Sequence, residues 1–112
     1  MNWKKLINSC VFFVIIAFSS LSYAEPVWID VRSAGEYMID NIEGDTRISH
    51  GEIVDEVNKM FTAKDTEISL YCRSGGRASK ARTALLDAGY TNVSNIGSIN
   101  DARKERGLIE AQ

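Results

Sequence analysis

The stretch TEISLYCRSGGRASKARTALLDAGYTNVSNI, residues 66–96, decides the fold class. Apolar and polar side chains alternate from Thr66 to Cys72, which is typical of a β-strand. After a loop with two glycines, small and apolar residues recur at helical spacing, and Gly89 stands where a helix can end in the left-handed conformation. Asn92 to Ile96 has the pattern of another strand. The stretch therefore predicts a strand–helix–strand unit with a right-handed crossover.

The rest of the chain continues this alternation of strands and helices. Val27 to Val31 predicts a first strand, and Arg47 to Ser49 a short second one. Helix starts are indicated by the S-x-x-E form of a capping box at Ser33 and at Ser49, and a polar final helix is predicted from Ser98 to Arg106. We therefore predict one α/β domain with a mainly parallel central sheet flanked by helices on both faces.

The first 24 residues have the pattern of a secretory signal peptide. A basic start at Lys4 and Lys5 precedes a mostly apolar run from Leu6 to Leu21, and Ser22-Tyr23-Ala24 supplies small residues at a cleavage site. We expect cleavage after Ala24, which would leave residues 25–112 as one exported domain, periplasmic in a Gram-negative host. The alternative is a retained membrane anchor, but the run is interrupted and short of the ~20 apolar residues of a span.

Charge excludes some partners of this domain. The whole chain carries 13 Lys and Arg against 15 Asp and Glu, and loss of Lys4 and Lys5 with the leader would change the net charge from −2 to −4. An acidic domain is a poor candidate for binding nucleic acid or an anionic membrane. An anionic ligand would therefore need a local basic site.

The cysteines narrow the search for that site. Cys10 lies in the apolar run of the leader, so Cys72 is expected to be the only cysteine of the exported chain. An unpaired cysteine in an oxidising compartment is either a reactive thiol or an inert buried residue that packs like a small apolar side chain. The neighbours of Cys72 favour the reactive thiol.

Those neighbours form the loop Cys72-Arg73-Ser74-Gly75-Gly76-Arg77, between a predicted strand and a predicted helix. Amides at a helix N-terminus bind anions and lower the pKa of a cysteine from its usual ~8.5. Gly75 and Gly76 would take backbone dihedrals that other residues avoid and let the loop curl into an anion-binding bowl. Arg73 and Arg77 would add guanidinium groups suited to oxyanions. An ordinary turn could hold any one of these residues. Their combination predicts a thiolate nucleophile at Cys72.

This loop resembles the active-site loop of the rhodanese family. Residues 28–37, WIDVRSAGEY, are similar to the family's D-V-R-x-x-x-E-Y segment, and Ile42-Glu43-Gly44 is similar to the turn that follows it. Gly89-Tyr90 and Asn95-Ile96-Gly97 match two later family elements. The resemblance covers nearly all of residues 27–101 and implies a small rhodanese-like fold.

The resemblance also implies a reaction. The Cys72 thiolate would take the outer sulfur of thiosulfate or a similar donor, sulfite would leave, and the persulfide would pass its sulfur to cyanide or a thiol with ping-pong kinetics. No metal and no organic cofactor are implied. One alternative is a persulfide carrier that hands sulfur to a protein partner. Another is a cysteine phosphatase or arsenate-type enzyme, whose loop resembles C-x5-R, whereas Cys72 to Arg77 is C-x4-R.

Two further residues have supporting roles by the same resemblance. Asp30 would end the first strand at the same sheet edge as Cys72 and help to hold the loop, and the alternative is a strand-end turn residue. Arg32 is expected to form an ion pair with Glu36 across the first helical turn, which is a structural role.

The chain departs from the family pattern in several places. Asn41 replaces a histidine, Asp45-Thr46 replaces a small and apolar pair, and Ser98 replaces the second glycine of the later turn. A tryptophan after that turn is missing. None of these changes removes the nucleophile or the loop arginines, so we expect them to affect stability and substrate fit.

Overall fold

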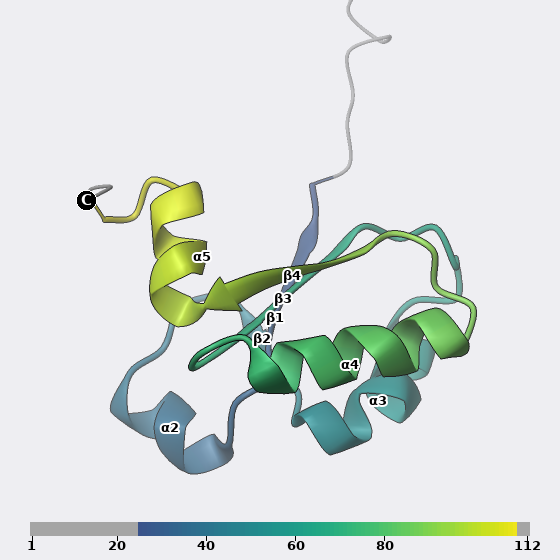
Figure 1. Cartoon of the computed structure of the whole chain (residues 1–112), viewed down its shortest axis with the longest axis horizontal. Helices are drawn as coiled ribbons and strands as arrows, with labels where there is room; N and C mark the ends of the chain where they lie inside the picture. The colour runs from purple at the N-terminus through teal and green to yellow at the C-terminus, as the bar shows by residue number, and fades with distance from the viewer. Residues whose placement is uncertain (1–24, 110–112) are drawn as a thin grey trace, which may run out of the picture.

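The computed structural model describes residues 25–109. Its four strands are β1 (Val27–Asp30), β2 (Thr46–Arg47), β3 (Ile68–Cys72) and β4 (Val93–Ser98). They form one parallel sheet in the order β2-β1-β3-β4 (Figure 1). The predicted signal peptide and its alternative, a membrane anchor, lie outside the described residues. Among residues 25–109, no helix has the length and apolar character needed to cross a membrane.

Helices cover both faces of this sheet. α3 (Ile53–Met60), which follows a short 3-10 turn η1 (His50–Glu52), and α4 (Gly76–Asp87) lie on one face, and α5 (Ile99–Glu105) lies on the other (Figure 1). α2 (Ala34–Ile39) follows β1 at the carboxyl edge of the sheet. The predicted α/β class, with a parallel sheet between helices, is confirmed.

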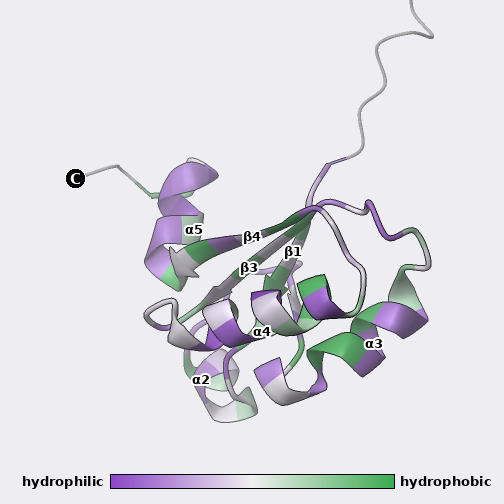
Figure 2. Ribbon diagram, turned by 45° about the vertical axis from the view of Figure 1, so that its right-hand side comes forward, coloured by the Kyte–Doolittle hydropathy of each residue, from purple (hydrophilic) through white to green (hydrophobic). Residues whose placement is uncertain are grey.

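The core has one part on each face of the sheet. The larger part joins Ile29 and Leu70 of the strands to Val57 and Leu85 of the helices, and the smaller part packs Tyr71 against α5. All five residues of β3 are buried, as expected for a central parallel strand covered on both sides. Figure 2 shows the hydrophobic residues concentrated along the central strands and the inward side of α3. The core thereby fixes the position of the loop that follows β3.

The local signals were correct at two helix starts and wrong at a third. Ser33 and Ser98 both form complete capping boxes, and Gly89 ends its helix with a φ of 100°. Ser49 makes no side-chain capping bond, because the amide of Glu52 bonds instead to the Ser49 carbonyl at 2.9 Å and closes a 3-10 turn. The α-helix therefore begins only at Ile53.

Candidate active site

The predicted loop lies at the carboxyl end of the central strand. Cys72 is the last residue of β3, and α4 begins at Gly76. Gly75 has a φ of 96°, a conformation that strains any residue with a Cβ, and its carbonyl accepts a hydrogen bond from Asn95 Nδ2 at 3.0 Å. Gly76 has no positive φ, so the expectation that both glycines take unusual dihedrals is wrong for Gly76. Helix α4 has already begun there.

The sulfur of Cys72 faces the backbone amides of this loop. The Gly75 N–H donates to Cys72 Sγ at 3.0 Å. Burial raises the pKa of the Cys72 thiol. Backbone hydrogen bonds to the sulfur lower this pKa by more than burial raises it, so the net shift is downward. The donors are the amides of Ala78, Ser74, Gly75 and Arg77. Cys72 is only 1% exposed and is part of the larger core cluster. The arrangement favours a thiolate held beneath a set of N–H donors.

Arg77 does not present its guanidinium freely to solvent. Its Nη1 and Nη2 donate to the two carboxylate oxygens of Glu36 at 2.6 and 2.9 Å, so α2 is tied to the start of α4. The hydrogen bonds from Arg77 hold the pKa of Glu36 well below its usual range. The pattern of the sequence did not predict this partner, because the two residues are 41 positions apart. The structural role of Arg77 is therefore to hold the loop against α2.

Asp30 and Arg32 form a second pair at the same edge of the sheet. Arg32 Nε and Nη2 donate to the Asp30 carboxylate at 2.9 and 2.7 Å, and the Arg32 amide donates to it at 3.0 Å. Both residues are buried, and a buried carboxylate needs such partners. The predicted pair between Arg32 and Glu36 is therefore wrong: each residue has a different partner. Arg32 also donates to the carbonyl of Asp40 at 2.6 Å, at the end of α2.

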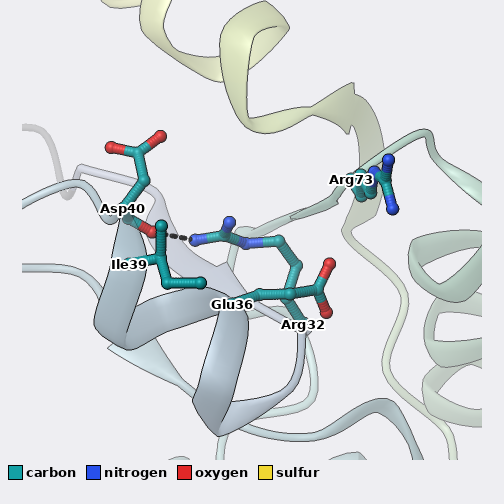
Figure 3. A pocket seen from close by; sticks show the side chains of 5 residues that line it. All are labelled: Arg32, Glu36, Ile39, Asp40 and Arg73. Atoms are coloured by element: carbon teal, nitrogen blue, oxygen red, sulfur yellow. Dashed lines mark hydrogen bonds between the residues drawn. The ribbon is translucent and has the colours of Figure 1, made fainter.

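A small open pocket of about 220 Å³ lies between α2 and the loop. Its lining residues are Arg32, Glu36, Ile39, Asp40 and Arg73. Arg73 comes from the loop and lies apart from the α2 residues (Figure 3). Asp40 is paired with Arg103 at 2.6 Å, and Arg32 and Glu36 have the partners given above. Among the charged side chains that line the pocket, Arg73 alone forms no ion pair within residues 25–109.

Three departures from the family pattern have local structural roles. Asp45 accepts a hydrogen bond from the hydroxyl of Tyr71 at 2.6 Å and two from Arg106 at 2.6 and 3.0 Å. Ser98 caps α5, and the Asn41 side chain donates to a backbone carbonyl at the end of α2. These residues stabilise the scaffold and do not touch the sulfur.

No group of three or more His, Cys, Asp or Glu side chains within residues 25–109 could hold a metal ion. The mechanism without metal or cofactor stays a prediction.

Ser74 contributes its amide to the sulfur site. Asn95 was missed as a loop-holding residue, although the element Asn95-Ile96-Gly97 marked its position.

The fold and this loop define a class of protein. The rhodanese-like domain family matches residues 19–104, and the chain belongs to that family. A solved structure described as a rhodanese with anions from E. coli superimposes with a TM-score of 0.65 at 28% identity, covering 69% of this chain and 91% of that one.

The relatives of this chain include a sulfurtransferase and an enzyme of another class. Within the family, the motifs and the predicted leader suggest similarity to the phage-shock thiosulfate sulfurtransferase. The thiosulfate sulfurtransferase PspE of Escherichia coli (strain K12) is 29% identical over 86 residues, which cover 77% of this chain and 83% of PspE. A tRNA uridine(34) hydroxylase of Buchnera aphidicola is 32% identical over 95 residues, but the chain spans only 29% of that enzyme. Rhodanese-like domains therefore also occur within proteins of other function.

Proposed function

We propose that this protein is a thiosulfate sulfurtransferase that moves sulfane sulfur from thiosulfate, or a similar anionic donor, to cyanide or a thiol. The observation that carries the proposal is the position of Cys72 Sγ, 3.0 Å from the Gly75 N–H at the start of a helix. Hydrogen bonds from loop amides favour the ionised sulfur, which is the nucleophile in such an exchange. The similarity to PspE supports the choice of thiosulfate as donor.

In the first half-reaction, the Cys72 thiolate attacks the outer sulfur of thiosulfate. A new S–S bond forms to Cys72, the original S–S bond breaks, and its electron pair leaves with sulfite. The product is an anionic persulfide on Cys72, so the total charge is unchanged. The loop amides that stabilise the thiolate also suit this anion.

In the second half-reaction, cyanide attacks the terminal sulfur of the persulfide. A carbon–sulfur bond forms, the S–S bond breaks, and Cys72 is released as a thiolate while thiocyanate leaves. A thiolate acceptor would react in the same way and would leave with a persulfide of its own. The two half-reactions share one site, which predicts ping-pong kinetics.

The side chains around the loop divide the supporting work. Arg73 is exposed and unpaired among the described residues, so it is the guanidinium available to attract an anionic donor. Arg77 positions the loop through Glu36, and the Asp30–Arg32 pair supports the sheet edge. This assignment needs neither a metal nor an organic cofactor. We place the protein in the periplasm, after cleavage of residues 1–24.

A persulfide carrier that loads once and serves a protein partner would use the same loop. Turnover separates the two functions, because an enzyme produces many equivalents of thiocyanate and a carrier only one.

Intact mass spectrometry of the protein after thiosulfate treatment tests the proposal. We expect a mass increase of one sulfur atom that cyanide removes, and no increase in Cys72→Ser. The same spectrum reports whether residues 1–24 have been removed. Absence of the sulfur adduct from the wild-type protein under conditions where its thiol alkylates normally would contradict the proposal.

A further inference from the structure

The surface beside the loop of residues 72–77 exposes apolar side chains, and the transfer of sulfur between small molecules does not explain them. α2 has no buried residue, and its last turn presents Met38 at 83% and Ile39 at 89% exposure. These are the two most exposed of the large hydrophobic side chains in residues 25–109. Ile39 also lines the pocket, to which the loop contributes Arg73 (Figure 3). An apolar patch of this kind next to a reactive site is typical of a protein contact surface.

Most of the charged side chains at this surface form ion pairs and cannot attract a further charged group. Glu36 is neutralised by Arg77 and Asp40 by Arg103, each at 2.6 Å, and Arg32 is taken up by Asp30. Arg73 is left as the unpaired charge of the pocket among the described residues. The patch therefore combines an apolar part, Met38 and Ile39, with one free guanidinium.

The patch is continuous with the site of sulfur transfer. Arg73 directly follows Cys72 in the chain, and Glu36, on the other side of the pocket, holds Arg77 at the end of the same loop. A segment lying across α2 and against Arg73 would reach the mouth of the loop. Cyanide and thiosulfate are too small to cover Met38 and Ile39 while they react at Cys72.

We propose that α2 and Arg73 form a docking surface for a protein sulfur acceptor. The occupant is an extended segment that carries a cysteine, with an apolar residue to pack on Met38 and Ile39 and an acidic residue to pair with Arg73. This inference rests on the proposed persulfide at Cys72. It names the acceptor class of that site: a protein thiol in an apolar and acidic sequence context.

The transfer step balances without an added oxidant or reductant. The acceptor thiolate attacks the outer sulfur of the anionic persulfide on Cys72. The S–S bond to Cys72 breaks, a new S–S bond forms on the acceptor, and the acceptor leaves as an anionic persulfide, so the total charge is unchanged. The electron pair returns to Cys72 as a thiolate, ready for another donor.

Short synthetic peptides serve as probes. The test peptide carries one cysteine flanked by leucine and aspartate, and a second peptide has lysine in place of aspartate. With thiosulfate in excess, we expect kcat/KM for persulfide formation on the peptide to be about tenfold higher for the aspartate peptide than for the lysine peptide. This ratio should fall as the salt concentration rises. Equal rates for the two peptides would overturn the charge part of the proposal.

The double variant Met38→Ser/Ile39→Ser tests the apolar part. We expect the ratio of peptide transfer to cyanide transfer to fall about tenfold, since both side chains lose their contact area with the peptide. The matched control is Met60→Ser/Leu86→Ser, which changes two exposed apolar residues of α3 and α4 and is expected to leave the ratio unaltered. An unchanged ratio in the α2 variant would overturn the docking surface.

Two outcomes separate this inference from its foundation. Loss of the sulfur adduct and of thiocyanate formation in the wild-type protein would remove the proposed function itself. Normal thiocyanate formation without peptide selectivity would remove only the docking surface. A wild-type dimer in analytical ultracentrifugation that the α2 variant dissociates would assign the patch to a second copy of the chain, and would also overturn the proposal.

Discussion

Two arginine–carboxylate pairs lie at the carboxyl edge of the sheet, and they differ in burial and in reach. The side chains of Asp30 and Arg32 are 0% and 6% exposed, and the two residues are neighbours at the end of β1. The side chains of Glu36 and Arg77 are 28% and 29% exposed, and their pair joins α2 to α4. The comparison suggests that the first pair secures the fold, whereas the second fixes the shape of the loop that follows Cys72.

The largest expected effect comes from breaking the buried pair. Asp30→Asn leaves the guanidinium of Arg32 buried without its charged partner, so we expect a loss of about 3 kcal/mol in the free energy of unfolding. Denaturant unfolding measures this loss. The control is Asp55→Asn at an exposed position of α3, expected to stay within about 0.5 kcal/mol of wild type. A loss equal to that of the control would show that the Asp30–Arg32 pair does not secure the fold.

A change in the loop should cost less stability and more activity. Gly75→Ala places a Cβ on a residue with a φ of 96°, at a strain of roughly 1–3 kcal/mol. Because the Gly75 amide donates to the sulfur, we expect kcat/KM for thiocyanate formation to fall at least about tenfold, consistent with about 1.4 kcal/mol. Gly76→Ala is the matched control, since Gly76 has helical backbone and no atom within 4 Å of an added Cβ. Equal effects of the two substitutions would argue against the special role of Gly75.

The smallest expected effect comes from breaking the part-buried pair of Glu36 and Arg77. Glu36→Gln removes the charge that orients Arg77, and we expect about 1 kcal/mol of lost stability and a severalfold lower kcat/KM. The sign with pH follows from the lowered pKa of Glu36. Its contribution is present above the ordinary glutamate pKa of about 4.3 and is lost as the pH falls through the lower folded value.

Glu43→Gln serves as the control for this third change, because Glu43 is exposed and forms no ion pair within the described residues. A Glu36→Gln variant with wild-type kinetics would mean that Arg77 keeps the loop in place without its partner. The comparison between the two pairs would then reduce to burial alone.

The parts of this molecule that were predictable from sequence are those set by local spacing. Alternation and helical periodicity located β3, α4 and β4, and the S-x-x-E signal at Ser33 gave a helix start. Ser49 carries the same signal, but a backbone bond from Glu52 replaced the side-chain cap. Local signals therefore located the elements better than their first residues.

The position of Cys72 in a strand-to-helix loop was predictable from the sequence, but the ion pairs around that loop were not. Cys72 and the loop amides are contiguous in sequence, so the anion-binding turn could be inferred from the chain. The partner of Arg77 could not, because Glu36 comes close only when α2 folds over the edge of the sheet. The same holds for the unpaired state of Arg73 among the described residues. It depends on the fold, because the nearby carboxylates of Asp30, Glu36 and Asp40 pair with other arginines.

The acidity of Cys72 is the central claim, and its titration tests that claim most directly. Iodoacetamide alkylates the thiolate form of a cysteine. The dependence of the alkylation rate on pH in the folded protein therefore reports the thiolate fraction of Cys72, the one cysteine within residues 25–109. We predict a midpoint clearly below the ordinary thiol pKa of ~8.5, because hydrogen bonds from the loop amides outweigh burial. A midpoint at or above that value would contradict the account.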